Sequence, residues 1–171
     1  MGNRSYLIAY NSDKNLKTID DPNYSIPDYF IFLFAKEKFK LVNNYSIQIP
    51  STVAIKKITL FLTKYKTLTN RDLLIKYFTS TFSKYKYVLL NIIELITIAY
   101  DNDDEILNEH NLVLDDLSNM DYNSFMNKWK RVFEFINTDD KYFSHFNIDI
   151  KQMSENSHDS VLNLINLLKL K

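Results

Sequence analysis

Glycine is almost missing from this chain of 171 residues, and its absence excludes several classes of enzyme. The single glycine is Gly2. Phosphate-binding loops, dinucleotide-binding fingerprints and nucleophile elbows all need glycine where the backbone turns tightly or approaches a ligand. We therefore expect none of these sites here. Because proline is also rare, with three residues, the turns must depend on Asn, Asp and Ser.

Cysteine is absent, so neither disulfides nor thiolate chemistry is available, and nothing indicates an oxidising compartment. The N-terminus shows no basic segment followed by an apolar core, and no apolar run reaches the about 20 residues of a membrane span. The sequence thus predicts a cytoplasmic protein without a membrane segment. Its length suits one globular domain over residues 1–171.

Net charge is zero, yet the two halves of the chain carry opposite charge. Residues 1–86 hold 14 basic and 6 acidic side chains, a net of +8, whereas residues 87–171 hold 7 and 15, a net of −8. Two interpretations stay open. Either the halves are neighbours whose surfaces attract each other within one domain, or the acidic half meets a basic partner.

The most apolar run, Tyr87–Tyr100, is the stretch around which we expect the fold to be organised. Its polar residues Asn91, Glu94 and Thr97 recur every third position, which predicts a helix that is apolar nearly all round and therefore buried. The alternative is a buried strand over Tyr85–Leu90 with a helix beginning near Asn91, because periodicity does not separate short apolar runs.

Upstream of this run, the patterns predict a short strand at Tyr6–Tyr10 and a polar loop reaching Asn23. A helix capped by Ser25 and ending near Lys38 follows, and then a hairpin across Asn43 and Asn44. The sequence predicts an α-dominated α+β fold, with about six helices around the central apolar helix and a small N-terminal β element.

Two further helices, over residues 51–66 and 71–84, carry lysines on the side expected to face solvent. Their aromatic residues alternate with these lysines, which is a feature of surfaces that bind single-stranded nucleic acid. The Tyr and Phe positions also coincide with the apolar stripe of each helix. We therefore favour packing in the core over base stacking, and we expect nucleic acid not to be the partner.

The segment Asp101–Asp121 contains eight acidic residues and no Lys or Arg. A calcium-binding loop would need glycine and glutamate at fixed positions that this segment does not supply. An acidic first turn of a helix explains the pattern better, since carboxylates there meet free N–H groups. We predict a partner-binding face formed by Asp101, Asp103, Asp104, Glu105, Glu109, Asp115 and Asp116.

Two helices are expected toward the C-terminus. Asp121 caps the first, whose apolar stripe continues through Trp129, expected in the core, to Ile136. The second, Val161–Leu170, is so apolar that it must dock, either into its own core or against another chain as a homodimer. No pair among His110, His145 and His158 has the spacing of a zinc site, and we predict no metal and no cofactor.

The opening Asn3-Arg-Ser-Tyr-Leu7 resembles an uncharacterised bacterial family whose members begin Met-Ala-Asn-Arg-Ser-Tyr-Leu-Tyr. Ile26-Pro27, and Tyr87-Val-Leu-Leu90 followed by Glu94, fit the same family more loosely. The chain departs from the family in having Ile8 where Tyr is usual and almost no glycine. The resemblance implies a small bacterial cytoplasmic protein with an N-terminal strand followed mostly by helices, and it implies no activity.

These observations favour a non-catalytic protein-binding protein, of the kind represented by an immunity protein or antitoxin, that acts through its acidic face. No catalytic residues are predicted, since no Ser, His or Asp constellation is framed by glycine. The alternatives are a hydrolase that uses carboxylates such as Glu94 in a cleft, or a nucleic-acid-binding protein that uses the basic N-terminal half.

Overall fold

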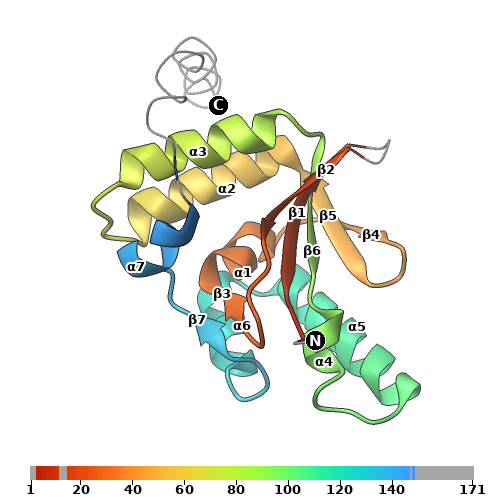
Figure 1. Cartoon of the computed structure of the whole chain (residues 1–171). Coiled ribbons are helices and arrows are strands. Elements are labelled where there is room, and N and C mark those ends of the chain that lie inside the picture. The colour runs from red at the N-terminus through yellow and green to blue at the C-terminus, as the bar shows by residue number, and fades with distance from the viewer. Residues whose placement is uncertain (1–2, 12–14, 147, 149–171) are drawn as a thin grey trace.

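The computed structural model describes residues 3–11, 15–146 and 148, and shows an α+β fold built on a five-stranded antiparallel sheet (Figure 1). In space the strands run β2-β1-β6-β5-β4. Their bounds are β1 (Tyr6–Tyr10), β2 (Leu16–Asp20), β4 (Lys40–Val42), β5 (Ser46–Pro50) and β6 (Tyr87–Asn91). The α+β class is confirmed. The expected β element was too small, because the sheet also takes a strand from the second half of the chain.

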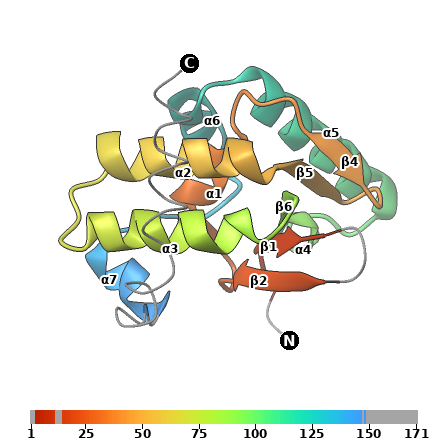
Figure 2. The ribbon, with the colours of Figure 1, turned by 90° about the horizontal axis from the view of Figure 1, so that it is seen from above.

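Seven α-helices lie in the described part of the chain, close to the six expected. They are α1 (Asp28–Phe34), α2 (Ser51–Lys64), α3 (Arg71–Ser83), α4 (Ile93–Ile96), α5 (Asp103–Asn119), α6 (Tyr122–Trp129) and α7 (Asp140–Phe143), the last followed by the 3-10 turn η1 (Ser144–Phe146). A short parallel pair, β3 (Ile26–Pro27) and β7 (Phe135–Ile136), leads into α1. The helices α2 and α3 lie side by side (Figure 2).

The apolar run Tyr87–Tyr100 is not a central helix, and this prediction was wrong. Its first part is β6, the middle strand of the sheet, and only Ile93–Ile96 is helical. Asn91 separates the two, because its Oδ1 accepts a hydrogen bond from the Ile93 backbone N–H at 3.1 Å. The alternative of a strand followed by a helix is the correct one. The run is still central, but as a strand bonded to β1 and β5.

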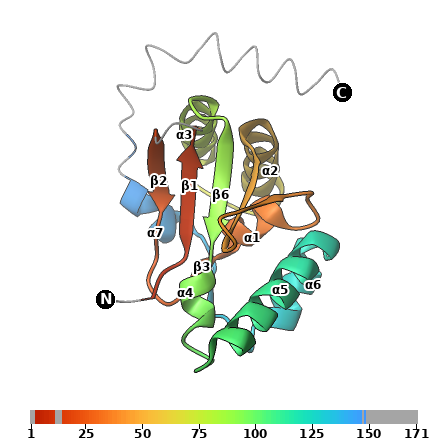
Figure 3. The same cartoon turned by 90° about the vertical axis from the view of Figure 1, so that its right-hand side faces the viewer.

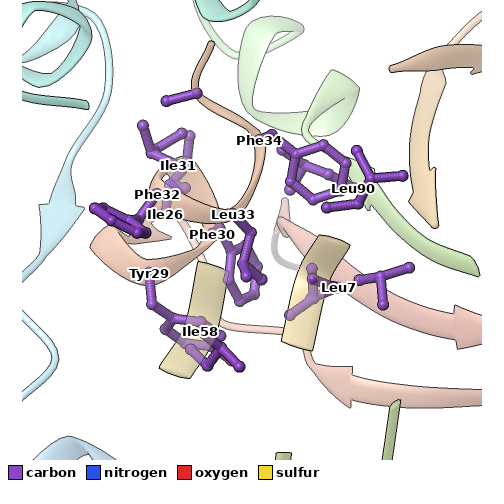
Figure 4. Packing of buried hydrophobic residues seen from close by; sticks show 14 of the residues in the cluster. Leu7, Ile26, Tyr29, Phe30, Ile31, Phe32, Leu33, Phe34, Ile58 and Leu90 are labelled. Atoms are coloured by element: carbon purple, nitrogen blue, oxygen red, sulfur yellow. The ribbon is translucent and has the colours of Figure 1, made fainter. Parts of the chain in front are cut away.

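The buried central helix is α1, whose seven residues Asp28–Phe34 are all buried. A helix that is apolar on every side has to be surrounded by other elements. It contacts α2, α5, α6 and β3. Figure 4 shows its side chains lying among Leu7 of β1, Leu90 of β6 and Ile58 of α2. Contacts with so many elements make α1 the centre of the hydrophobic core.

Several local predictions are corrected by long-range contacts. The segment expected to be a polar loop contains β2, which is an edge strand paired with β1. The helix expected from Ser25 to Lys38 begins only at Asp28 and ends at Phe34, since Lys36 adopts a φ of 59°. The helix capped by Asp121 ends at Trp129 instead of continuing to Ile136.

Other local predictions are confirmed. The hairpin turns at Asn43 and Asn44, which have φ values of 47° and 66°. Asp121 caps α6 by accepting a hydrogen bond from the Ser124 backbone N–H at 2.9 Å. Trp129 lies in the core with 5% of its surface exposed. The strand at Tyr6–Tyr10 forms as expected, with Leu7 facing the core and Tyr6 on the opposite side.

Candidate functional site

The predicted acidic face lies on α5 and the turn before it. Asp101, Asp103, Asp104, Glu105 and Asp115 are exposed, whereas Glu109 and Asp116 are half-buried. The helix begins as expected, with three carboxylates in its first turn and Asn102 Oδ1 accepting a hydrogen bond from the Glu105 backbone N–H at 2.8 Å. Five of the seven predicted residues therefore present their carboxylates to solvent.

The two half-buried residues have partners within the chain. Asp116 accepts a hydrogen bond from the Trp129 indole N–H at 2.9 Å and forms an ion pair with Lys128 at 2.6 Å. It thus joins α5 to α6. Glu109 lies beside Tyr100, where desolvation first and the Glu109 carboxylate second raise the pKa of the Tyr100 hydroxyl. Asp116 is therefore a structural residue, and the free acidic surface is narrower than predicted.

Exposed leucines share the outer surface of α5 with these carboxylates. Leu107 is 45% exposed and Leu112 is 56% exposed. Side chains three or four positions apart are neighbours on a helix, so Leu107 lies next to Asp103 and Asp104, and Leu112 next to Glu109 and Asp115. The outer surface of α5 consequently combines negative charge with apolar area.

The lysine-bearing helices α2 and α3 do not neutralise the carboxylates of α5. Helices α2 and α3 lie at one end of the molecule and α5 at the other in both side views (Figure 1, Figure 3). The basic half does reach α5 through α1 and the Lys36 backbone N–H, which donates to the Leu117 carbonyl at 2.8 Å, but the lysines of α2 and α3 do not lie against its carboxylates. The aromatic residues Phe61, Phe78 and Phe82 of the basic helices are fully buried. They pack in the core, as predicted, and are not available to stack on nucleic-acid bases, whereas Tyr65 at the end of α2 is 44% exposed, contrary to the prediction.

A second polar cluster, which the sequence patterns did not indicate, surrounds Asp20. Between β1 and β2 the register shifts, so that Asp20 pairs with Leu7, whose side chain faces the core. A shift of one residue turns a side chain to the opposite face of a sheet. The Asp20 carboxylate accepts hydrogen bonds from the hydroxyls of Tyr29 at 2.8 Å and Tyr142 at 2.6 Å. Burial, followed by the charge of Asp20, raises the pKa of both tyrosines well above 10.

Asp28 occupies a neighbouring buried position at the start of α1. Its Oδ2 forms an ion pair with Lys66 Nζ at 2.6 Å, and its Oδ1 accepts hydrogen bonds from the Thr138 backbone N–H at 3.2 Å and Oγ1 at 2.5 Å. Tyr122 donates a longer bond of 3.3 Å to Oδ2. Every one of these donors belongs to the chain itself. The Asp28 cluster consequently has the form of a structural tie between α1, the segment after α2, the first residue of α6 and the segment after β7.

Glu94, the carboxylate considered for acid or base chemistry, joins α4 to the N-terminal segment. It accepts hydrogen bonds from the Arg4 backbone N–H at 2.9 Å and from the Tyr6 hydroxyl at 3.0 Å. These contacts hold Arg4 and Tyr6, which belong to the segment that resembles the bacterial family, against α4. They do not place a second carboxylate beside Glu94, as the chemistry of a two-carboxylate hydrolase requires.

The histidines are dispersed. His110 is buried in α5, and neither ring nitrogen has a hydrogen-bond partner among the described residues. His145 Nε2 lies 3.4 Å from Asp20, and His158 is outside the described residues, as is the predicted helix Val161–Leu170. Within residues 3–11, 15–146 and 148, no group of three His, Asp or Glu side chains has the geometry of a metal site.

The outer face of the sheet is a further candidate that we did not predict. It contains a depression of about 470 Å³ lined by Tyr6, Ile8, Tyr10, Asn11, Leu16, Val42, Asn43, Ser46, Leu89 and Asn91. The alternation along β1 indicates this surface only once the pairing with β6 is known.

No described helix is long and apolar enough to cross a membrane.

Comparison with known proteins adds no assignment to these surfaces. No family model, no curated protein and no solved structure matches the chain.

Proposed function

We propose that this protein is a protein-binding protein, not an enzyme, and that it binds a basic partner through the outer surface of α5. The observation that carries the proposal is the combination of unneutralised carboxylates with two exposed leucines on one helix. Fixed like charges repel one another, so a face of this kind favours a partner that brings opposite charge. The leucines add apolar area that such a partner removes from water.

The chemistry of the partner follows from this surface. It presents lysine or arginine together with apolar side chains, because charge alone would leave Leu107 and Leu112 in water. An amphipathic basic helix has both features at the required spacing. Attraction between the opposite charges raises the rate of association and falls with ionic strength. An inhibitory role like that of an immunity protein or antitoxin is the narrower form of this proposal.

The experiment uses two synthetic helical peptides as probes, one with lysines and leucines at helical spacing and one with lysines and polar residues. We expect the leucine-containing peptide to bind more tightly and its affinity to fall as salt is raised. The double variant Glu105→Gln/Asp115→Asn should weaken binding at low salt. Leu112→Ala should weaken binding of the leucine-containing peptide without changing its salt dependence.

The matched control is Asp72→Asn/Glu134→Gln, which removes one Asp and one Glu that are also exposed but lie off α5. Asp116 is left unchanged because it pairs with Lys128 and Trp129. If the two double variants lower affinity equally, binding depends on total charge and the α5 surface is not the site. If binding ignores both ionic strength and the α5 substitutions, the proposal is overturned.

A further inference from the structure

The central strands of the sheet are apolar on both faces. Strand β1 reads Tyr-Leu-Ile-Ala-Tyr and β6 reads Tyr-Val-Leu-Leu-Asn. An antiparallel sheet with one face in water normally alternates apolar and polar side chains, whereas strands covered on both sides are apolar throughout. Leu7, Ala9, Val88 and Leu90 face the helices and are buried. On β1 and β6 the side chains of the other face are therefore those expected of a covered surface, whereas the neighbouring strand β5 adds the polar side chains Ser46 and Gln48.

No described helix covers this second face, which we call the open sheet face. Figure 3 shows the strands in front of α2 and α3, with their other side turned to the viewer. The strand pairing places Tyr6, Ile8 and Tyr10 of β1 beside Tyr87, Leu89 and Asn91 of β6 on this face. Leu16 of β2 extends it at the edge and is 58% exposed.

The charge of the open sheet face restricts the chemical class of the segment that can bind to it. The ten residues that line its depression carry no charged side chain, and the strand register places one lysine, Lys40 of the edge strand β4, on the same face. Several of its polar groups already have partners, since Asn91 Nδ2 donates to Ser46 Oγ at 2.9 Å, the Tyr10 hydroxyl donates to Gln48, and the Tyr6 hydroxyl donates to the Glu94 carboxylate at 3.0 Å. A phosphate backbone requires basic groups, and a strongly charged peptide requires opposite charge. The chemistry fits an uncharged apolar segment.

We propose that the open sheet face binds the chain's own C-terminal segment, Val161–Leu170. Seven of its ten residues are Val, Leu or Ile, and Asn163, Asn166 and Lys169 form one polar stripe at helical spacing. On such a helix Val161, Leu164 and Leu168 lie opposite the stripe. Ten helical residues extend about 15 Å, and a strand of five residues extends about 17 Å, so the two surfaces match in length.

The connection between the two is long enough. Ile148 lies beside Leu73 and Leu74 of α3, on the side of the molecule that carries α7. The Tyr142 hydroxyl of α7 is bonded to Asp20 of β2, so this side adjoins the edge strand of the sheet. Residues 149–160 span at most about 40 Å when extended. The chain can therefore pass around β2 and reach the open sheet face without crossing the helix layer.

Disulfide trapping in the full chain tests the proposal, because the protein has no cysteine of its own. In the double variant Leu89→Cys/Leu168→Cys we expect an intramolecular disulfide to form about ten times faster than in Leu89→Cys/Asn166→Cys, whose second cysteine lies on the polar stripe. A second control, Lys56→Cys/Leu168→Cys, places the first cysteine on the exposed side of α2. It should be equally slow.

Thr18→Cys replaces Leu89→Cys if the latter disturbs folding, since Thr18 is exposed and shares the face with Ile8. Equal rates in the test pair and both controls would overturn the proposal. Disulfides that form only between two chains, when singly substituted proteins are mixed, would also overturn it and would assign the face to a second copy. Neither outcome affects the α5 surface, which uses different residues.

Discussion

Single buried polar side chains in this protein differ in whether they have partners. His110 is 1% exposed and has no hydrogen-bond partner among the described residues. Asp28, by contrast, is bonded to Lys66, Thr138 and Tyr122. A buried group without partners destabilises the fold, and a buried ion pair makes each member dependent on the other. We therefore expect substitutions at the two sites to change the stability of the protein in different ways.

For His110 the prediction concerns pH. Desolvation lowers the pKa of its imidazole below 6.5, although the Tyr45 backbone opposes the shift. The unfolded chain then binds a proton at a higher pH than the folded chain, so stability falls as pH drops below about 6.5, until the lowered folded pKa is reached. Urea denaturation at pH 7.5 and pH 5 should show a smaller loss of stability for His110→Leu than for the wild type. Identical losses would contradict this assignment.

For the ion pair the prediction concerns a buried charge. Replacing Lys66 by Met leaves the Asp28 carboxylate buried without its cation, which we expect to cost about 3 to 5 kcal/mol of unfolding free energy. Lys64→Met removes an exposed lysine near the same end of α2 and should cost far less. Denaturant midpoints of the two variants give the comparison. Equal, small losses would show that water replaces Lys66 at Asp28.

At the scale of elements, α4 shows how a very short helix is held in place. It has four residues, yet Leu95 is only 6% exposed and Glu94 is bonded to the Arg4 backbone and the Tyr6 hydroxyl. An isolated helix of this length does not persist in water. Its conformation therefore depends on the apolar contacts of Leu95 and on the tie to the N-terminal segment.

We expect Leu95→Ala to destabilise the protein by about 2 to 5 kcal/mol, because truncating a buried leucine loses transfer free energy and leaves a cavity. Ile98→Ala is the matched control, since Ile98 lies three residues away and is 54% exposed. Its cost should be within about 0.5 kcal/mol of zero. Thermal and urea unfolding of both variants provide the test. An unchanged melting curve for Leu95→Ala would mean that α4 does not contribute to the core.

At the scale of the whole molecule, the packing around α1 predicts a single cooperative unit. This helix contacts α2 on the basic side and α5 and α6 on the acidic side, so neither region can lose its structure without exposing α1. We expect one calorimetric transition whose calorimetric and van't Hoff enthalpies agree. A separate low-temperature transition of α5 and α6 would show instead that the acidic region unfolds independently.

The sequence alone was enough to predict the α+β class, the strand at Tyr6–Tyr10, the Asn43–Asn44 turn, the two basic helices, the acidic first turn of α5 and the cap of α6. These features depend on side chains within a few positions of each other, so local periodicity and capping chemistry indicate them. The exposure of the α5 carboxylates could also be predicted, because eight acidic residues without a basic neighbour rarely become buried.

Only the tertiary structure decided the rest. Tyr87–Asn91 is a strand because β1 and β5 supply hydrogen bonds on both of its edges, and those strands lie about 40 and 80 residues away in sequence. Asp20 turns inward because the register shifts against β1, and Asp116 is paired because α6 brings Lys128 to it. Long-range pairing of this kind has no local signature in the chain. The residues around each partner show the same local sequence pattern whether or not the other partner lies near in the fold.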